Sequence, residues 1–218
     1  VRGLDPDAKE WEHLDWFTQQ LQQIAGSKES DREEVARRSR LTEALALLSS
    51  VQPVMNRLFL GVSDWRAGDR VLDLYAGVGL FARFLGEAVG RSGAVGLVEG
   101  DRTAVSHART NLATLPGAWE AVSGDVERVL ARPRGDLLTG AVDLVVLDPP
   151  RQGARRKVVR EVARRNARRI AYVACDPAAL ARDTAYLREA GYSLASLRAL
   201  DLFPMTHHVE CVALFHRD

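Results

Sequence analysis

The sequence has few cysteines and no long apolar run, and both shortages narrow what the protein can be. Its 218 residues include only Cys175 and Cys211, too few for a disulfide framework or for holding an iron–sulfur cluster. No apolar stretch reaches the roughly 20 residues of a membrane helix, and the N-terminus lacks the basic-then-apolar layout of a signal peptide. We therefore expect a cytoplasmic protein that does not contact a membrane.

The sequence also lacks a strong net charge, because 30 Lys and Arg residues nearly balance 29 Asp and Glu residues. The charges are unevenly distributed, however. Between Arg151 and Arg169, nine basic residues accompany a single acid, Glu161. Such a basic stripe is typical of a surface that contacts phosphate, but it is equally consistent with the solvated face of a helix. Composition leaves both interpretations open.

Residues 1–60 differ in pattern from the rest of the chain. They are polar, and their apolar residues recur at helical spacing in two stretches separated by a connector at residues 26–31. We expect residues 1–60 to form a helical segment of unknown role. Residues 61–218 are enough for one domain with a single hydrophobic core.

From Arg70 onward, short apolar strands alternate with amphipathic helices. The predicted strands are Arg70–Leu74, Ala94–Glu99, Trp119–Ser123, Val142–Leu147, Arg169–Ala174, Ser193–Phe203 and Val209–His216. This repetition predicts an α/β fold with a mostly parallel, doubly wound sheet. The last two strands are too close in sequence for a crossover, so we expect them to be antiparallel. Rossmann-like class I methyltransferases have this arrangement, and such sheets bind ligands at the carboxyl ends of their strands.

The first predicted strand leads into the motif DLYAGVGLFA, which begins at Asp73. Gly77 and Gly79 allow the backbone to turn tightly and to approach a ligand where a side chain would clash. A dinucleotide fingerprint would require a third glycine, but Phe81 and Ala82 occupy that region. An acid at the start of the motif instead suits a cofactor with a positive sulfonium and an amino group, S-adenosylmethionine.

Acidic residues also follow the next two strands. Glu99, about twenty residues after the glycines, is placed to accept both hydroxyls of a ribose. Asp125 could reach the amino group of an adenine, although on its own this residue is better interpreted as a helix cap. Three successive strand ends that carry acids favour a bound adenosine.

The fourth and fifth strands end in motifs that indicate chemistry on a base. Asp148 opens the corner DPPR, in which two prolines fix an extended backbone without N–H donors. Enzymes that methylate amino groups of bases usually have an aromatic residue after such a corner, so Arg151 argues against that reaction. Cys175 precedes a helix whose first turn contains Pro177, and the helix dipole should lower the pKa of this thiol. Considered alone, a single free cysteine is more often a small, buried hydrophobic residue.

The last predicted hairpin contains the sequence FPMTHHVEC. Glu210 lies near the start of a strand that should be central and apolar, where an acid is costly unless it forms a salt bridge or has a function. His207 and His208 are adjacent, so they point to opposite faces of a strand, and no third ligand is evident. We therefore expect no metal site.

The stretches DLYAGVGLFA, DPPRQG, YVACDPAALARD and FPMTHHVECVAL have the order and spacing found in the RNA uracil-5 methyltransferases. The chain resembles the catalytic domain of this family, whose members form 5-methyluridine in transfer RNA and large-subunit ribosomal RNA. The resemblance implies that Cys175 is the nucleophile, that Glu210 is the general base, and that RNA is the partner. The predicted site is completed by residues at the other strand ends: Tyr75, Gly77, Glu99, Asp125 and Asp148 for the cofactor S-adenosylmethionine, and Arg151 for the RNA.

Two features depart from the family pattern. Family members usually have an N-terminal RNA-binding β-barrel, and some have a cysteine cluster for iron–sulfur, but we recognise neither in this sequence. They also have a strand whose glutamine contacts the cofactor, for which Gln52 is the available candidate. Two alternatives therefore stay open: a non-catalytic module that binds cofactor or RNA, and a methyltransferase acting on carbon 5 of cytosine.

Overall fold

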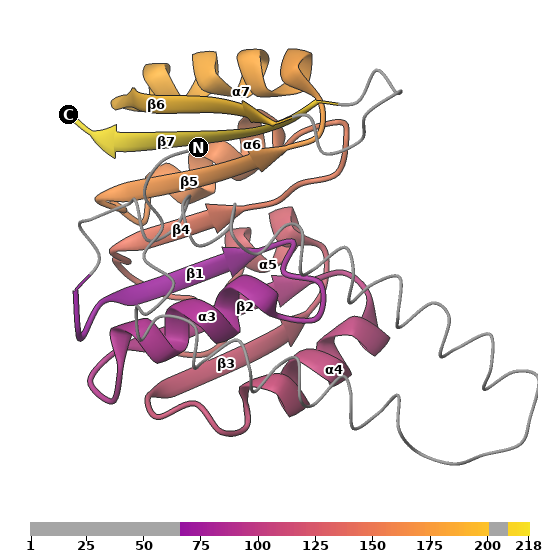
Figure 1. The fold of residues 1–218 in the computed structure, drawn as a ribbon, viewed down its shortest axis with the longest axis vertical. Helices are drawn as coiled ribbons and strands as arrows, with labels where there is room; N and C mark the ends of the chain where they lie inside the picture. Colours follow the sequence, from indigo (N-terminus) through magenta and orange to yellow (C-terminus); the bar gives the residue numbers. More distant parts are fainter. Residues whose placement is uncertain (1–65, 201–208) are drawn as a thin grey trace, which may run out of the picture. The chain divides into compact units, whose positions relative to one another are not determined.

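The computed structural model describes residues 66–200 and 209–218, which form a sheet flanked by helices (Figure 1). The strands are β1 (Arg70–Leu74), β2 (Ala94–Glu99), β3 (Ala118–Ser123), β4 (Leu144–Leu147), β5 (Arg169–Ala174), β6 (Tyr192–Leu200) and β7 (Glu210–Arg217). The helices are α3 (Leu80–Val89), α4 (Arg102–Leu112), α5 (Val126–Ala131), α6 (Arg155–Ala163) and α7 (Pro177–Glu189). The segment 1–60, Gln52 and the pair His207 and His208 lie outside the described residues.

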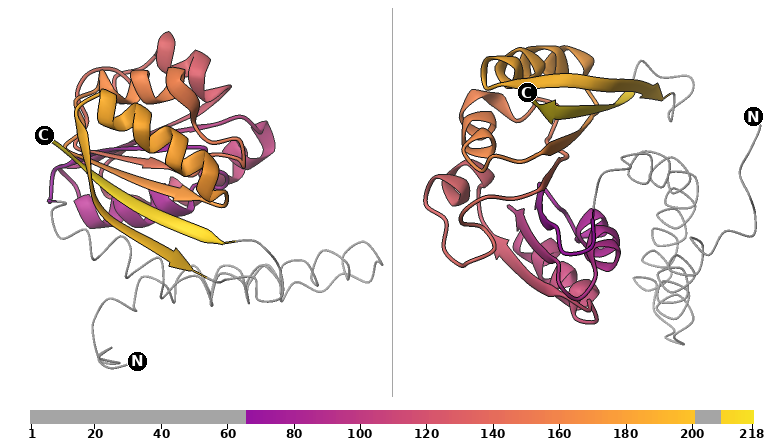
Figure 2. Two further views of the ribbon diagram at one scale, coloured as in Figure 1. Left: turned by 90° about the horizontal axis from the view of Figure 1, so that it is seen from above. Right: turned by 90° about the vertical axis from the view of Figure 1, so that its left-hand side faces the viewer.

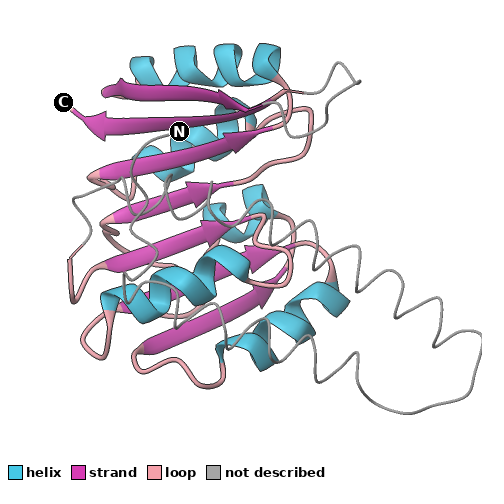
Figure 3. Cartoon of the chain, in the orientation of Figure 1, coloured by secondary structure: helices cyan, strands magenta, loops and turns pink. Residues whose placement is uncertain are grey.

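The strand order confirms the predicted fold. The sheet runs β3-β2-β1-β4-β5-β7-β6, with parallel pairing from β3 to β5 and antiparallel pairing of β7 with both its neighbours. Strands and helices alternate along the chain (Figure 3), with α3 and α4 on one face of the sheet and α5, α6 and α7 on the other (Figure 2). The winding reverses between β1 and β4, so the carboxyl ends of these two strands mark the place where such sheets bind ligands.

Several strand boundaries differ from the prediction. Strand β4 begins at Leu144 rather than Val142, because the Val142 N–H donates to the carbonyl of Arg165 at 3.1 Å instead of joining the ladder. The other differences are the start of β3 at Ala118 rather than Trp119, the start of β6 at Tyr192 rather than Ser193, and the bounds of β7, Glu210–Arg217 rather than Val209–His216; the predicted end of β6 at Phe203 lies outside the described residues. None of these changes moves the carboxyl ends of β4 and β5, where functional residues were predicted.

The hydrophobic core lies on both faces of the central strands. All four residues of β4 and four of the five residues of β1 are buried. Consecutive burial is expected where helices cover a parallel sheet on both sides, and it makes these strands a rigid support for the loops at their ends. Within residues 66–200 and 209–218, no helix is long and apolar enough to cross a bilayer.

Candidate active site

The turn after β1 has a tight, left-handed backbone. Tyr75, Gly77 and Gly79 have φ angles of 62°, 53° and 81°, and the Tyr75 N–H donates to the Val98 carbonyl of β2 at 2.9 Å. A Cβ added at Gly77 would meet no described atom within 4 Å, whereas one added at Gly79 would lie 3.2 Å from the Ala108 side chain of α4. Gly77 therefore leaves room for a ligand, and Gly79 leaves room for a packed helix.

Glu99 connects this turn to the end of β2. One of its carboxylate oxygens accepts the Gly77 N–H at 2.9 Å, and the other accepts the Asp101 N–H at 2.8 Å. A carboxylate oxygen has two lone pairs, so both oxygens keep the capacity to accept a further hydrogen bond from a ligand. The acid predicted to bind ribose hydroxyls is thus fixed directly beside the glycine turn.

Asp73 is completely buried beneath the turn. Its side chain is 0 % exposed, and Oδ2 accepts the Ala82 N–H of α3 at 2.9 Å. Desolvation raises the pKa of Asp73 to about 7, opposed by the Ala82 hydrogen bond and assisted by the charges of Asp148 and Glu99. Because no oxygen of Asp73 reaches the surface, its charge acts on a ligand only through the protein between them.

Asp125, which follows β3, acts electrostatically on Tyr75 in the turn after β1. Asp125 is the N-cap of α5 and accepts the Arg128 N–H at 3.0 Å, so the capping interpretation is confirmed. Its side chain is exposed and accessible to a ligand as well. Desolvation raises the pKa of Tyr75 to about 12, and the charge of Asp125 is the next cause. The phenol is therefore neutral at physiological pH and can act as a hydrogen-bond donor.

Cys175 and Glu210 face each other across the pair β5–β7. The last paired residues of these antiparallel strands are Ala174 and Cys211. One step further, the same register places Cys175 directly opposite Glu210. Residues opposite each other on antiparallel strands have side chains on the same face of the sheet. The structure thus brings the predicted nucleophile and the predicted base together.

The expected fall in the pKa of Cys175 is wrong. Burial raises the pKa of this half-buried thiol above its ordinary value of 9.0, the charge of Glu210 raises it further, and the charge of Arg151 lowers it. The helix dipole was overestimated because Cys175 precedes the N-cap. Asp176 is the cap, and its carboxylate accepts the Ala179 N–H at 2.7 Å. At neutral pH the thiol is therefore mostly protonated.

Asp148 and Arg151 both act electrostatically on Cys175. Although the Asp148 side chain is exposed, the surrounding protein excludes enough water to raise its pKa to about 6, and the charge of Glu210 contributes to the rise. Desolvation also raises the pKa of Glu210 itself. The charges of Asp148 and Arg151 both act on Cys175. Four of the predicted residues are thus brought to the carboxyl ends of β4 and β5.

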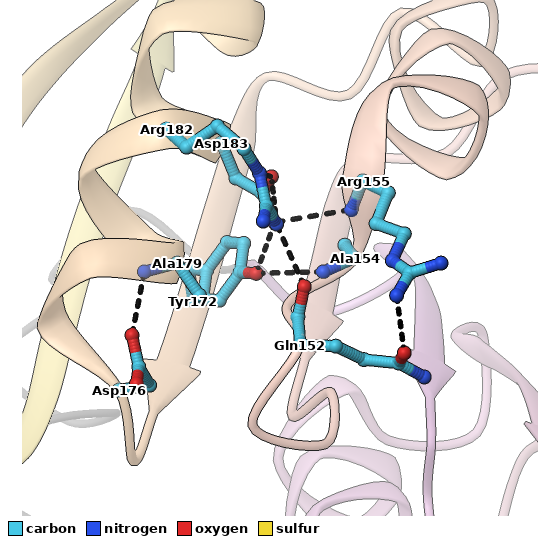
Figure 4. A network of polar contacts seen from close by, with 8 residues as sticks. All are labelled: Gln152, Ala154, Arg155, Tyr172, Asp176, Ala179, Arg182 and Asp183. Atoms are coloured by element: carbon cyan, nitrogen blue, oxygen red, sulfur yellow. Dashed lines mark hydrogen bonds and ion pairs between the residues drawn. The ribbon is translucent and has the colours of Figure 1, made fainter.

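A buried network that holds the DPPRQG corner was missed by the sequence interpretation. The Tyr172 hydroxyl of β5 accepts the Ala154 N–H at 2.9 Å and donates to Oδ2 of Asp183 in α7 at 2.7 Å (Figure 4). Tyr172 and Asp183 are both 0 % exposed. A signal was present in the sequence, because Asp183 stands at helical spacing from Leu180 and Leu187 on the buried face of α7. An acid on an apolar stripe requires a buried partner.

Gly153→Ala is expected to destabilise the fold through this network. An added Cβ would lie 2.5 Å from Asp183 Oδ2, and that oxygen cannot move because Tyr172 and the Arg155 N–H hold it. We expect a loss of about 1–3 kcal/mol beyond that of Gly140→Ala, measured by urea unfolding. Gly140 is a matched control because its φ of 80° is close to the 73° of Gly153, but nothing described lies within 4 Å of its Cβ position. Equal losses for the two variants would contradict the clash.

The basic stripe is largely engaged in contacts within the protein. Arg165 is buried and donates to the carbonyls of Leu130 and Leu138, and Arg168 pairs with Asp69 and Asp143. Further pairs join α6 to acids of its own and neighbouring elements: Arg156–Glu189, Lys157–Glu127 and Arg164–Glu161. The helix-face interpretation therefore accounts for much of the stripe.

The sheet order and the glycine turn with its neighbouring acid define a Rossmann-like methyltransferase fold. Residues 120–218 match the sequence pattern of the family described as tRNA (Uracil-5-)-methyltransferase. Over the matched residues the chain is thus similar to the RNA uracil-5 methyltransferases, the family that its sequence resembles.

Individual proteins show the same relationship. A protein of Streptomyces avermitilis described as an uncharacterized RNA methyltransferase is 56% identical over 154 residues, which cover 68% of this chain and 33% of that protein. The 23S rRNA (uracil(1939)-C(5))-methyltransferase RlmD of Psychrobacter arcticus is 38% identical over 171 residues, covering 77% and 32%. The structure of Pyrococcus abyssi tRNA (uracil-54, C5)-methyltransferase in complex with S-adenosyl-L-homocysteine has a TM-score of 0.56 and 31% identity, covering 73% and 37%. The chain spans about a third of the length of the curated relatives it matches.

Proposed function

We propose that the protein transfers a methyl group from S-adenosylmethionine to carbon 5 of a uridine in RNA. The observation that carries this proposal is the β5–β7 register, which sets Cys175 opposite Glu210 beside Asp148 and Arg151. The Psychrobacter arcticus and Pyrococcus abyssi proteins are by name uracil-C5 methyltransferases of 23S ribosomal RNA and of transfer RNA, which supports a structured RNA as the partner.

The residues around the β1 turn fit S-adenosylmethionine. The open side of Gly77 admits a ligand, Glu99 can accept ribose hydroxyls, and Asp125 can accept the adenine amino group. Tyr75 follows β1 and Asp148 follows β4, the strand between β1 and β5, so both are candidates for further cofactor contacts. The carboxylates also favour a positively charged sulfonium. When bound, the cofactor supplies an electrophilic methyl group.

Cys175 makes carbon 5 of the uracil nucleophilic. After the thiol loses its proton to solvent, its sulfur forms a bond to carbon 6, and the electrons of the C5–C6 double bond pass into an enolate. Carbon 5 can then accept the methyl group. Arg151, at the end of the DPPR corner, is placed to contact the flipped uridine or its phosphate, because the base must leave its stack to reach a thiol at a strand end.

Glu210 completes the reaction. It removes the proton from carbon 5, the C5–C6 double bond forms again, and the sulfur of Cys175 leaves with the electrons of the S–C6 bond. A carboxylate with a raised pKa is a stronger base than an ordinary glutamate, and desolvation provides this at Glu210. Its position opposite Cys175 places the base on the same side of the sheet as the adduct.

Mass spectrometry of nucleosides from RNA treated with the protein and S-adenosylmethionine tests the proposal. Formation of 5-methyluridine is the expected result. Formation of 5-methylcytosine would instead identify a cytosine-C5 methyltransferase, which also uses a thiolate. No modified nucleoside, together with no binding of S-adenosylmethionine in calorimetric titration, would favour a non-catalytic scaffold.

The rate of adduct formation should keep rising with pH into the alkaline range. The reactive species is the thiolate, and a raised pKa means that its fraction still increases at and above pH 9.0, the ordinary pKa of cysteine. Single-turnover trapping on RNA that contains 5-fluorouridine, quenched on denaturing gels, gives this rate at each pH. A plateau below about pH 8 would indicate a lowered pKa and contradict the burial argument.

A further inference from the structure

We propose that Tyr172 and Asp183 together position the corner Asp148–Arg151 against the strand end that carries Cys175. This inference rests on the proposed function, in which the corner and Cys175 enclose the uridine. Both side chains are completely buried, so neither touches a substrate, and both are positioning residues.

The corner has few internal means of holding its shape. Pro149 and Pro150 have no N–H group to donate. At the upstream end, the Asp148 N–H donates to the Leu74 carbonyl at 3.3 Å, and within the loop the Gly153 N–H donates to the Pro150 carbonyl at 2.7 Å. The downstream end of the corner therefore depends on hydrogen bonds to groups outside the loop.

Tyr172 and Asp183 supply these outside contacts on consecutive residues. The Tyr172 hydroxyl accepts the Ala154 N–H at 2.9 Å, and Asp183 Oδ2 accepts the Arg155 N–H at 3.1 Å (Figure 4). Arg155 has a φ of 67°, a conformation that is strained for a residue with a side chain. Such a backbone persists only where its surroundings hold it, and the Asp183 carboxylate provides one of those contacts.

Arg182 extends these contacts upstream to Gln152. Its guanidinium donates to Asp183 Oδ1 at 2.8 Å and to the Gln152 carbonyl at 2.7 Å. Asp183 thus has donors on both oxygens, which compensates a fully buried charge. Gln152, Ala154 and Arg155 are bound in this way to β5 and α7.

The same two elements orient the nucleophile. Tyr172 lies on β5, three residues before Cys175. Asp183 lies in α7, which begins at Pro177, two residues after Cys175. The hydrogen bonds that Tyr172 and Asp183 accept from the loop therefore tie the corner to the strand before the thiol and to the helix after it. Losing these hydrogen bonds should shift Asp148 and Arg151 relative to Cys175 without altering the turn at Gly77.

Tyr172→Phe removes one hydroxyl and keeps the ring, so the fold should survive. Tyr192→Phe is the matched control, because Tyr192 is equally buried and donates to the Ala167 carbonyl at 3.0 Å, near the opposite ends of the parallel strands. For each variant of the full chain we would measure kcat and KM for methylation, the Kd for S-adenosylmethionine, the unfolding midpoint, and hydrogen exchange of the amides at Ala154 and Arg155.

For Tyr172→Phe we expect kcat to fall by about 10²-fold, since small misplacements of reacting groups have effects of this size, with cofactor Kd unchanged within about twofold. The Ala154 and Arg155 amides should exchange faster. Tyr192→Phe should also lose stability, but its kcat and the exchange of both amides should be unchanged.

An unchanged kcat and unchanged exchange in Tyr172→Phe would overturn the positioning role, as would equal losses of kcat in both variants. If the unmodified protein forms no 5-methyluridine, the proposed function fails. The exchange measurement then decides alone whether Tyr172 and Asp183 hold the corner.

Discussion

Replacing Cys175 with alanine is expected to abolish methylation, with a loss of about 10⁴-fold or more in kcat/KM. Without the sulfur, no bond to carbon 6 can form, and carbon 5 stays too weak a nucleophile to take the methyl group. The covalent step can be measured separately. RNA containing 5-fluorouridine has no carbon-5 proton to lose, so the adduct should persist on a denaturing gel with the unmodified protein and be absent with Cys175→Ala.

Cys211→Ala is the matched control for this experiment. Cys211 is the other thiol of the chain, and it is paired with Ala174, one step along the ladder from Cys175. Successive side chains of a strand point to opposite faces, so the Cys211 thiol is directed away from the side of the sheet that carries Glu210. This variant should keep the trapped adduct. Full activity of Cys175→Ala, or loss of the adduct in Cys211→Ala alone, would disprove the assignment of the nucleophile.

The central sheet could be predicted in detail from the sequence. Strands β1, β2 and β5 have the bounds predicted from their largely apolar sequences. In a parallel sheet covered on both faces, burial is continuous along the strand, and the first polar residue after each run marks its end. The short link before β7 fixed the antiparallel direction of the last pair, and this direction sets Glu210 against Cys175.

The electrostatics of the site could not be predicted in the same way. The sequence shows that Cys175 precedes a helix, and that local fact indicated a lowered pKa. The structure shows burial and a carboxylate from the neighbouring strand, and these outweigh the dipole. Contacts between residues distant in sequence decide the pKa, and periodicity contains no information about them.

The ion-pair partners of individual charged residues could not be predicted from the sequence either. Lys157 pairs with Glu127 of α5, and Arg168 pairs with Asp69 before β1. Only the packing of the elements creates these pairs, so a count of basic residues overstates the charge available to RNA. The place of Arg151 in the fold could be predicted, because this residue directly follows a strand end.

Glu210→Gln is expected to stop the reaction after methyl transfer. The amide keeps the size of the carboxylate, but it cannot remove the proton from carbon 5, so turnover should fall by about 10²–10⁴-fold. Cys175 would still add to carbon 6, and the methylated adduct would accumulate. Denaturing gels with ordinary uridine RNA should then show a covalent complex that carries the radiolabel of the methyl group, which the unmodified protein does not retain.

The control for Glu210→Gln is Glu189→Gln at the end of α7. Glu189 is exposed and pairs with Arg156, so its loss changes the charge of the protein by the same amount far from the β5–β7 register. This variant should turn over normally and accumulate no complex. A Glu210→Gln protein that releases 5-methyluridine at the normal rate would show that another group takes the proton. Asp148, with a pKa of about 6 and an electrostatic link to Cys175, would then be the next residue to replace.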